Sequence, residues 1–152
     1  MANMTANEQL MLELVNRARM DPLGEARRMG IGLNDGIKAG AISSTPKQVL
    51  AGNDKLAASA DAHSTWMLNT DTFSHTGVNR STPTDRMKAA GYVFTGLWTN
   101  GENISLVGST GTLDLTASIV QQHKNLFLSK TGHRENLMTD GFLAKDFAAE
   151  LP

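Results

Sequence analysis

Proline and glycine divide this 152-residue chain into short, well-capped helices joined by irregular segments. Pro22 and Pro83 each follow a residue that can cap a helix, and the fixed φ of proline suits the first helical turn. Gly30 and Gly91 follow a few residues later, where glycine commonly ends a helix. The pattern therefore predicts a fold that packs several short helices together.

Apolar residues at helical spacing, with capping residues ahead of them, place the main helices. Thr5 and Glu8 form a capping-box pair before the first of these stretches. The expected helices cover about 7–20, 54–68, 82–90 and 112–127, with a short one from Pro22 that ends at Gly30. Leu68 should face inward on the helix at 54–68, as should Leu115 on the helix at 112–127.

The remaining segments are of two kinds. Residues 31–52 are rich in Gly, Ser and Ala, which indicates a long surface loop. Segments 92–98 and 101–107 carry β-branched and aromatic residues and suit strands or strand-like loops. A turn at Asp140–Gly141 and one short final segment should complete the chain.

Composition excludes several classes of protein. The length fits a single domain over residues 1–152, and no run of about 18 apolar residues predicts a transmembrane helix. The net charge is −1 without a long basic run, so nucleic-acid binding is not expected. Cysteine is absent, which removes disulfides, cysteine–zinc sites and thiol nucleophiles. The start, MANMTANEQLML, lacks the basic and apolar blocks of a signal peptide.

Four histidines are the residues most able to carry chemistry: His63, His75, His123 and His133. None lies in an HExxH motif, and the GxSxG nucleophile elbow is absent, so a metal site would have to be assembled from distant parts of the chain. Taken alone, each histidine is more often a structural hydrogen-bonding residue than a ligand.

Read together, three short motifs change this interpretation. FSHTG contains His75, GENIS contains Glu102 and GHRENLM contains His133. With the opening NEQLMLELVNRARMDP, LAASADAHSTWM and STPTDRMKAAGY, they form a colinear series over about residues 7–142. The sequence resembles the CAP superfamily of cysteine-rich secretory, antigen 5 and pathogenesis-related 1 proteins, and most closely its cysteine-free bacterial branch of SCP-like extracellular proteins.

The resemblance implies an α+β fold, an α-β-α sandwich with a small antiparallel sheet between helices and a large cleft on one side. His75, Glu102 and His133 should line that cleft, with His63 nearby as a partly exposed helix residue. The second glutamate of the family is missing, because Leu126 lies about where it would fall.

Other residues of these motifs have structural interpretations. His123 lies where relatives have a packing tryptophan, which favours a place in the core. Arg134 and Glu135 should pair with neighbours or cap the turn, and Asn136 should bind loop backbone.

The end of the chain departs from the family pattern. Only fourteen residues follow Met138, so the C-terminal strands should be shortened and one central strand missing. Because an unpaired sheet edge is usually covered, we expect a partner chain, a swapped segment or a rearranged C-terminus there, and thus a homo-oligomer through the shortened edge.

Three functions are compatible with these residues. The first is an exported, non-enzymatic protein that binds a small apolar or lipid-like ligand, or a partner, in the cleft; secretion is implied by the resemblance. The alternative is a zinc-dependent hydrolase or peptidase, in which His75 and His133 hold zinc or another divalent cation and Glu102 is the candidate catalytic residue that activates water. The third is a scaffold whose cleft is vestigial.

Overall fold

The computed structural model describes residues 4–140 and 146–147 of the chain. The α-helices of this part are α1 (Ala6–Met20), α2 (Pro22–Arg28), α3 (Asp54–Asn69), α4 (Pro83–Ala89), α5 (Leu115–Leu128) and α6 (His133–Leu137). A 3-10 helix, η1 (Val78–Arg80), precedes α4, and two short strands, β1 (Ala51–Gly52) and β2 (Asp146–Phe147), pair in parallel. Every predicted helix is present, although α5 begins at Leu115 rather than near residue 112.

The helix starts follow the predicted caps. The Thr5 hydroxyl accepts a hydrogen bond from the Glu8 amide at 3.2 Å, and the Glu8 carboxylate accepts one from the Thr5 amide at 2.6 Å. Thr82 caps α4 with the same reciprocal pair of bonds, whereas the side chains of Asp21 and Asn53 cap α2 and α3 by accepting from backbone amides alone. Each cap satisfies amides that have no partner inside the helix, so local sequence fixes where these helices begin.

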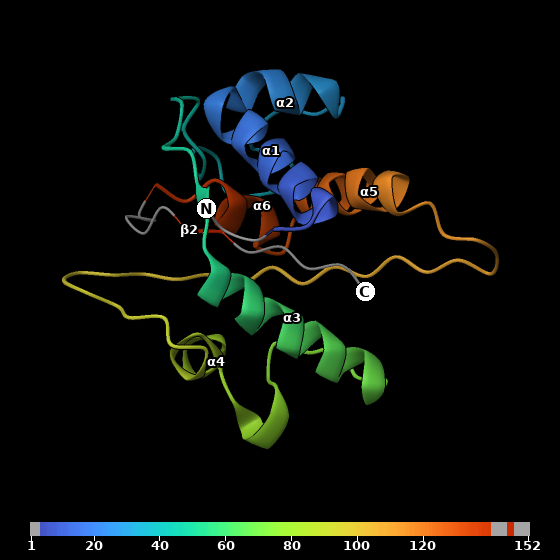
Figure 1. The fold of residues 1–152 in the computed structure, drawn as a ribbon. Helices are drawn as coiled ribbons and strands as arrows, with labels where there is room; N and C mark the ends of the chain where they lie inside the picture. The colour runs from blue at the N-terminus through green and yellow to red at the C-terminus, as the bar shows by residue number, and fades with distance from the viewer. Residues whose placement is uncertain (1–3, 141–145, 148–152) are drawn as a thin grey trace.

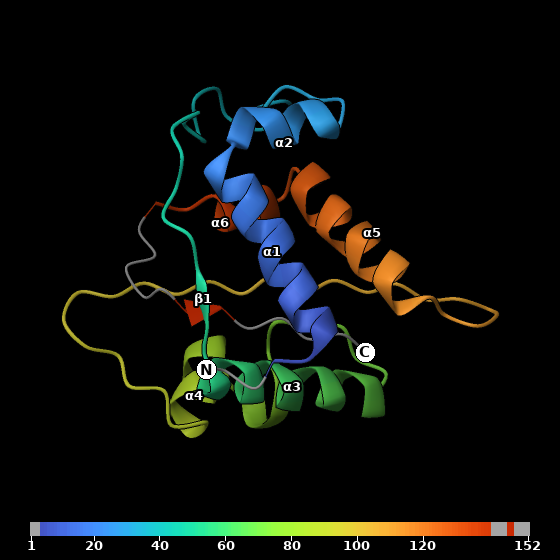
Figure 2. The ribbon, with the colours of Figure 1, turned by 45° about the horizontal axis from the view of Figure 1, so that its top comes forward.

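The helices form two groups with an irregular middle layer between them. Helices α1, α2, α5 and α6 pack together on one side, whereas α3 and α4 pack together on the other (Figure 1). The long segment 93–113 crosses between the two groups, and β1 lies between them as well (Figure 2). The order of layers is helix, irregular chain and helix.

The hydrophobic core belongs to only one of these groups. Its fully buried apolar residues come from α1, α2, α5, α6 and the loop at 33–50, for example Val15, Ala18, Ile119 and Phe127. Within the described part of the chain, no buried apolar residue lies between 51 and 118. Helices α3 and α4 therefore cover the core group without sharing its dense packing.

Arg134 ties three parts of the core group together. Its side chain is buried and donates to the carbonyls of Phe127 and Leu128 at the end of α5, at 2.5 and 3.2 Å. The same guanidinium donates to the carbonyls of Leu33 and Asp35 at 3.1 and 3.0 Å. The prediction that Arg134 is structural is confirmed.

Arg19 likewise ties separate segments together, at the C-terminal end of α6. It is fully buried and donates to the carbonyls of Gln48, Leu137 and Thr139. The loop before β1 and the end of α6 are thereby held against α1. Burial lowers the pKa of both arginines, but guanidinium stays charged at any physiological pH.

The predicted antiparallel sheet is wrong for the described residues. The strand pair there is parallel, with Ala51 opposite Asp146 and Gly52 opposite Phe147. Segments 92–98 and 101–107 form no strand, so the alternative of strand-like loops holds for them. A strand needs a neighbour to pair with, and β propensity alone does not supply one. That a partner chain covers the sheet edge stays a prediction.

Two predicted inward residues are exposed instead. Leu68 is 55% exposed near the end of α3, and Leu115 is 46% exposed in the first turn of α5. Both lie near the end of their helix. The helical spacing of apolar residues continues to these positions, but the side chains there are not buried against other elements. The final segment and the turn at Asp140–Gly141 lie largely outside the described residues. No helix in the described part is long and apolar enough to span a membrane.

A buried charge cluster joins α1, α2 and α5. Glu25 has a fully buried side chain and accepts hydrogen bonds from Arg17 at 2.6 and 2.8 Å and from Arg28 at 3.2 Å. His123 donates Nε2–H to the same carboxylate at 2.9 Å and is itself buried, so its predicted place in the core is confirmed. Burial opposes ionisation of Glu25, but the bonds from His123 and Arg17 outweigh it and lower its pKa to about 2.

We expect Glu25→Gln to lower the free energy of unfolding by about 2 kcal/mol at pH 7, because charge-assisted hydrogen bonds are lost. A carboxylate with a lowered pKa stabilises the fold above its unfolded value of 4.5, and that contribution disappears as the pH falls toward 2. The wild type should therefore lose more stability than Glu25→Gln across this range in urea titrations.

Glu13→Gln is the matched control. It removes the same charge as Glu25→Gln, but from a side chain that is exposed on α1. It should change stability by less than about 0.5 kcal/mol. Equal effects of the two substitutions would contradict a structural role for the buried cluster.

Candidate functional site: a cavity beside Glu102

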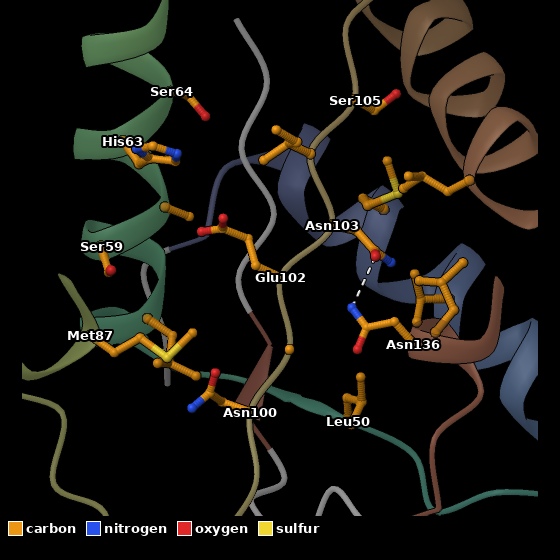
Figure 3. A pocket seen from close by; sticks show the side chains of 18 of the residues that line it. Leu50, Ser59, His63, Ser64, Met87, Asn100, Glu102, Asn103, Ser105 and Asn136 are labelled. Atoms are coloured by element: carbon orange, nitrogen blue, oxygen red, sulfur yellow. Dashed lines mark hydrogen bonds between the residues drawn. The ribbon is translucent and has the colours of Figure 1, made fainter. Parts of the chain in front are cut away.

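A cavity of about 200 Å³ lies between α3 and α4 on one side and α1 and α5 on the other. Its wall is mostly apolar and includes Met11, Val15, Leu50, Met67, Met87 and Phe94. Figure 3 shows Ser59, His63 and Ser64 along α3, Asn103 and Asn136 on the opposite wall, and Glu102 between them. The cavity follows from the fold, because the two helix groups have no dense common core.

Glu102 is held by two cationic or potentially cationic side chains. Its Oε1 accepts a hydrogen bond from His75 Nδ1 at 2.8 Å, and its Oε2 accepts one from Arg86 Nη2 at 2.5 Å. Arg86 also donates to the carbonyls of His75 and Ser81 at 3.1 and 2.9 Å. Both carboxylate oxygens are thus occupied, and the Glu102 charge is balanced where it meets the cavity.

His63 is buried on α3, with 3% of its surface exposed, so the prediction of a partly exposed residue was wrong. Its Nε2–H donates to the Ser74 carbonyl at 2.9 Å, which joins α3 to the loop that carries His75. Burial and the nearby Arg86 lower the pKa of His63, so the ring is neutral at pH 7. His63 lines the cavity through this neutral ring.

His133 occupies the first position of α6. Gly132 precedes it with φ of 99°, a left-handed conformation that favours glycine. Burial and, secondarily, the proximity of His75 lower the pKa of His133. Glu102 and His63 line the cavity, whereas His75 and His133 do not.

Asn136 pairs with another side chain rather than with loop backbone, which corrects its prediction. Its Nδ2 donates to Asn103 Oδ1 at 2.9 Å, and Asn103 Nδ2 donates to the His133 carbonyl at 3.3 Å. Gly101 permits this contact, because a Cβ built there would overlap the Asn136 side chain. The GENI and GHREN motifs are joined through these two asparagines.

The site offers limited chemistry from its own side chains. Since His75 donates through Nδ1, its Nε2 carries the lone pair that could bind a cation or accept a proton. In the described part of the chain, no three histidine, aspartate or glutamate side chains stand together as a metal-binding group. His75 and His133 could supply two ligands at most, and solvent water would have to complete the coordination.

Three residues of the site were missed by sequence reasoning. Arg86, Asn103 and Gln122 gain their roles from residues 16 or more positions away, or from the cavity itself. Asn103 follows Glu102 directly in GENI and could have been singled out with that motif. Nothing in the sequence distinguishes Arg86 or Gln122 from surface residues of the same type.

A comparison with protein families identifies the family of this chain. The family model of the CAP cysteine-rich secretory protein family matches residues 12–142, a range that contains His75, Glu102 and His133. The chain belongs to the CAP family. No curated protein and no solved structure matches the chain. The predicted membership is confirmed. Within this CAP chain, FSHTG meets GENIS through the His75–Glu102 bond, and GHRENLM meets it through Asn103.

We expect Gly101→Ala to lower the free energy of unfolding by about 1–2 kcal/mol, because the added methyl group displaces Asn136 and breaks its bond to Asn103. Gly108→Ala is the matched control on the same segment, since nothing lies within 4 Å of a Cβ there. Chemical denaturation measures both. Equal stability of the two variants would show that the asparagine pair is not required.

Proposed function

We propose that this CAP protein acts outside the cell as a non-enzymatic binder of a small apolar ligand, held in the cavity beside Glu102. The observation that carries the proposal is the apolar wall of that cavity, to which α1, α3, α4, α5 and segment 92–105 all contribute. Cavities with apolar walls bind apolar molecules because the wall gives up no hydrogen bonds to water when the ligand enters.

The size of the cavity limits the ligand. An engineered protein cavity of about 150 Å³ binds benzene, so about 200 Å³ admits a substituted single ring or a short alkyl chain. A lipid-like ligand would therefore enter with only part of its apolar body. The balanced charge of Glu102 supports binding rather than acid–base chemistry, because both oxygens already accept hydrogen bonds.

We expect toluene to stabilise the folded protein, with a rise in unfolding free energy that reaches about 2.7 kcal/mol at one hundred times its dissociation constant. Ala60→Phe should abolish most of this gain, because Ala60 lines the cavity and the added ring fills it. Ala58→Phe, on the exposed side of α3, should leave the gain intact. Thermal unfolding in sealed cells gives the comparison, and a wild type that is indifferent to toluene would overturn the proposal.

The second candidate function is a zinc-dependent hydrolase or peptidase at the same motifs. The bond from His75 Nδ1 to Glu102 favours it, since histidines that bind metal through Nε2 usually donate Nδ1–H to a carboxylate. His75 and His133 would hold the ion, and zinc would supply a polarised water. The lowered pKa of His133 keeps its ring neutral at pH 7, as ligation requires.

Free zinc at one hundred times its dissociation constant should then raise the unfolding free energy by about 2.7 kcal/mol at pH 7. The gain should disappear in acid, because protonated imidazole does not bind metal. His75→Ala or His133→Ala should abolish it, whereas His63→Ala should retain most of it. Equal stabilisation of the wild type and the double variant would remove the zinc function.

A further inference from the structure

Gln122 is a buried polar residue of the cavity wall whose side chain has no hydrogen-bond partner among residues 4–140. It lies on α5, is 4% exposed, and lines the cavity among apolar neighbours such as Met11, Val15 and Leu126. Across the described residues, no side-chain hydrogen bond is made by its amide, whereas the adjacent Gln121 is exposed and bonds to Asn125 at 2.7 Å. A carboxamide on the exposed face is thus paired, and the one on the cavity wall is not.

Ser59 repeats this situation on the opposite wall. It is 7% exposed on α3, lines the cavity, and its hydroxyl likewise has no partner in the part of the chain that the structure describes. In the described part of the chain, the fully enclosed side-chain atoms without partners belong to Arg19, His63, Ser81 and His123, and none of them belongs to Gln122 or Ser59. The polar atoms of Gln122 and Ser59 therefore reach open space, and the open space beside both residues is the cavity.

Burying a side-chain amide without a hydrogen bond destabilises the folded protein, unless a ligand or a water molecule supplies the missing bonds. Most buried polar groups in native proteins have a hydrogen-bond partner, so one that lacks a partner calls for an explanation. A carboxamide presents one acceptor and two donors side by side, and its best complement is a group with an adjacent donor and acceptor.

The charge of the cavity wall further restricts which chemical group of a ligand can pair with Gln122. Of the described residues that line the cavity, Glu102 alone is formally charged at neutral pH, and it is balanced by Arg86. A charged head group would lose its hydration without gaining a free counter-charge. The head of the ligand should therefore be neutral.

We infer that the cavity recognises a small uncharged amphiphile, with an apolar body of about one ring and a carboxamide-like head that pairs with Gln122. The inference rests on the proposed function and specifies its ligand class. Ser59 offers a second hydrogen bond to a ligand that spans the cavity. Water alone on Gln122 is the competing occupant, and the test separates the two.

The test uses benzamide, toluene and benzoate as probes of the whole chain at pH 7, with affinities from titration calorimetry or NMR. Gln122→Met removes the amide group but keeps a side chain of similar length and volume. It should weaken benzamide about tenfold and leave toluene unchanged or tighter. Gln121→Met, the matched control, should change neither. Benzoate should bind at least tenfold more weakly than benzamide to the wild type, because its charge would be buried.

A direct readout keeps the inference testable if Gln122→Met does not fold. Benzamide should shift the side-chain amide resonances of Gln122 in the wild type more than those of Gln121. Toluene binding without benzamide binding, or equal loss of both probes in Gln122→Met, would overturn the inference and leave the apolar cavity standing. Failure of both toluene and benzamide to bind the wild type would overturn the proposed function itself.

Discussion

Two buried arginines organise the part of the protein on which everything else rests. Arg19 and Arg134 together bind seven backbone carbonyls, from loops and helix ends that lie about 100 residues apart in sequence. Guanidinium suits this role because its donors fan out in a fixed plane and its charge is permanent. In a chain without cysteine, these hydrogen bonds supply the long-range links that disulfides supply elsewhere.

The consequence of this arrangement is a protein with one dense side and one open side. The buried apolar residues gather around α1 and α5, where the arginines hold the loops in place. Helices α3 and α4 lie across an irregular middle layer, in which segment 93–113 forms no backbone–backbone hydrogen bonds within the described chain. Its residues are exposed or half-exposed. The cavity beside Glu102 is the space that this layer leaves unfilled.

The balanced charge of Glu102 determines the electrostatic character of this cavity. Arg86 and His75 occupy both oxygens of Glu102, and burial keeps His63 neutral, so the wall of the cavity carries little net charge. The same His75–Glu102 bond leaves Nε2 of His75 available, which is why a zinc function remains a candidate beside apolar binding. Both properties arise from one carboxylate whose two partners, His75 and Arg86, come from separate segments of the chain.

The sequence alone determined the helices and the identity of the motifs. Caps such as Thr5, Asn53 and Thr82 act on amides within three residues, so their effect can be predicted from neighbouring letters. The family motifs that contain His75 and Glu102 lie within one matched region. Tertiary structure decided the parallel pairing of β1 with β2, the burial of His63, and the roles of Arg86 and Gln122. These depend on contacts between distant segments, and a side chain's environment is not encoded in the residues next to it.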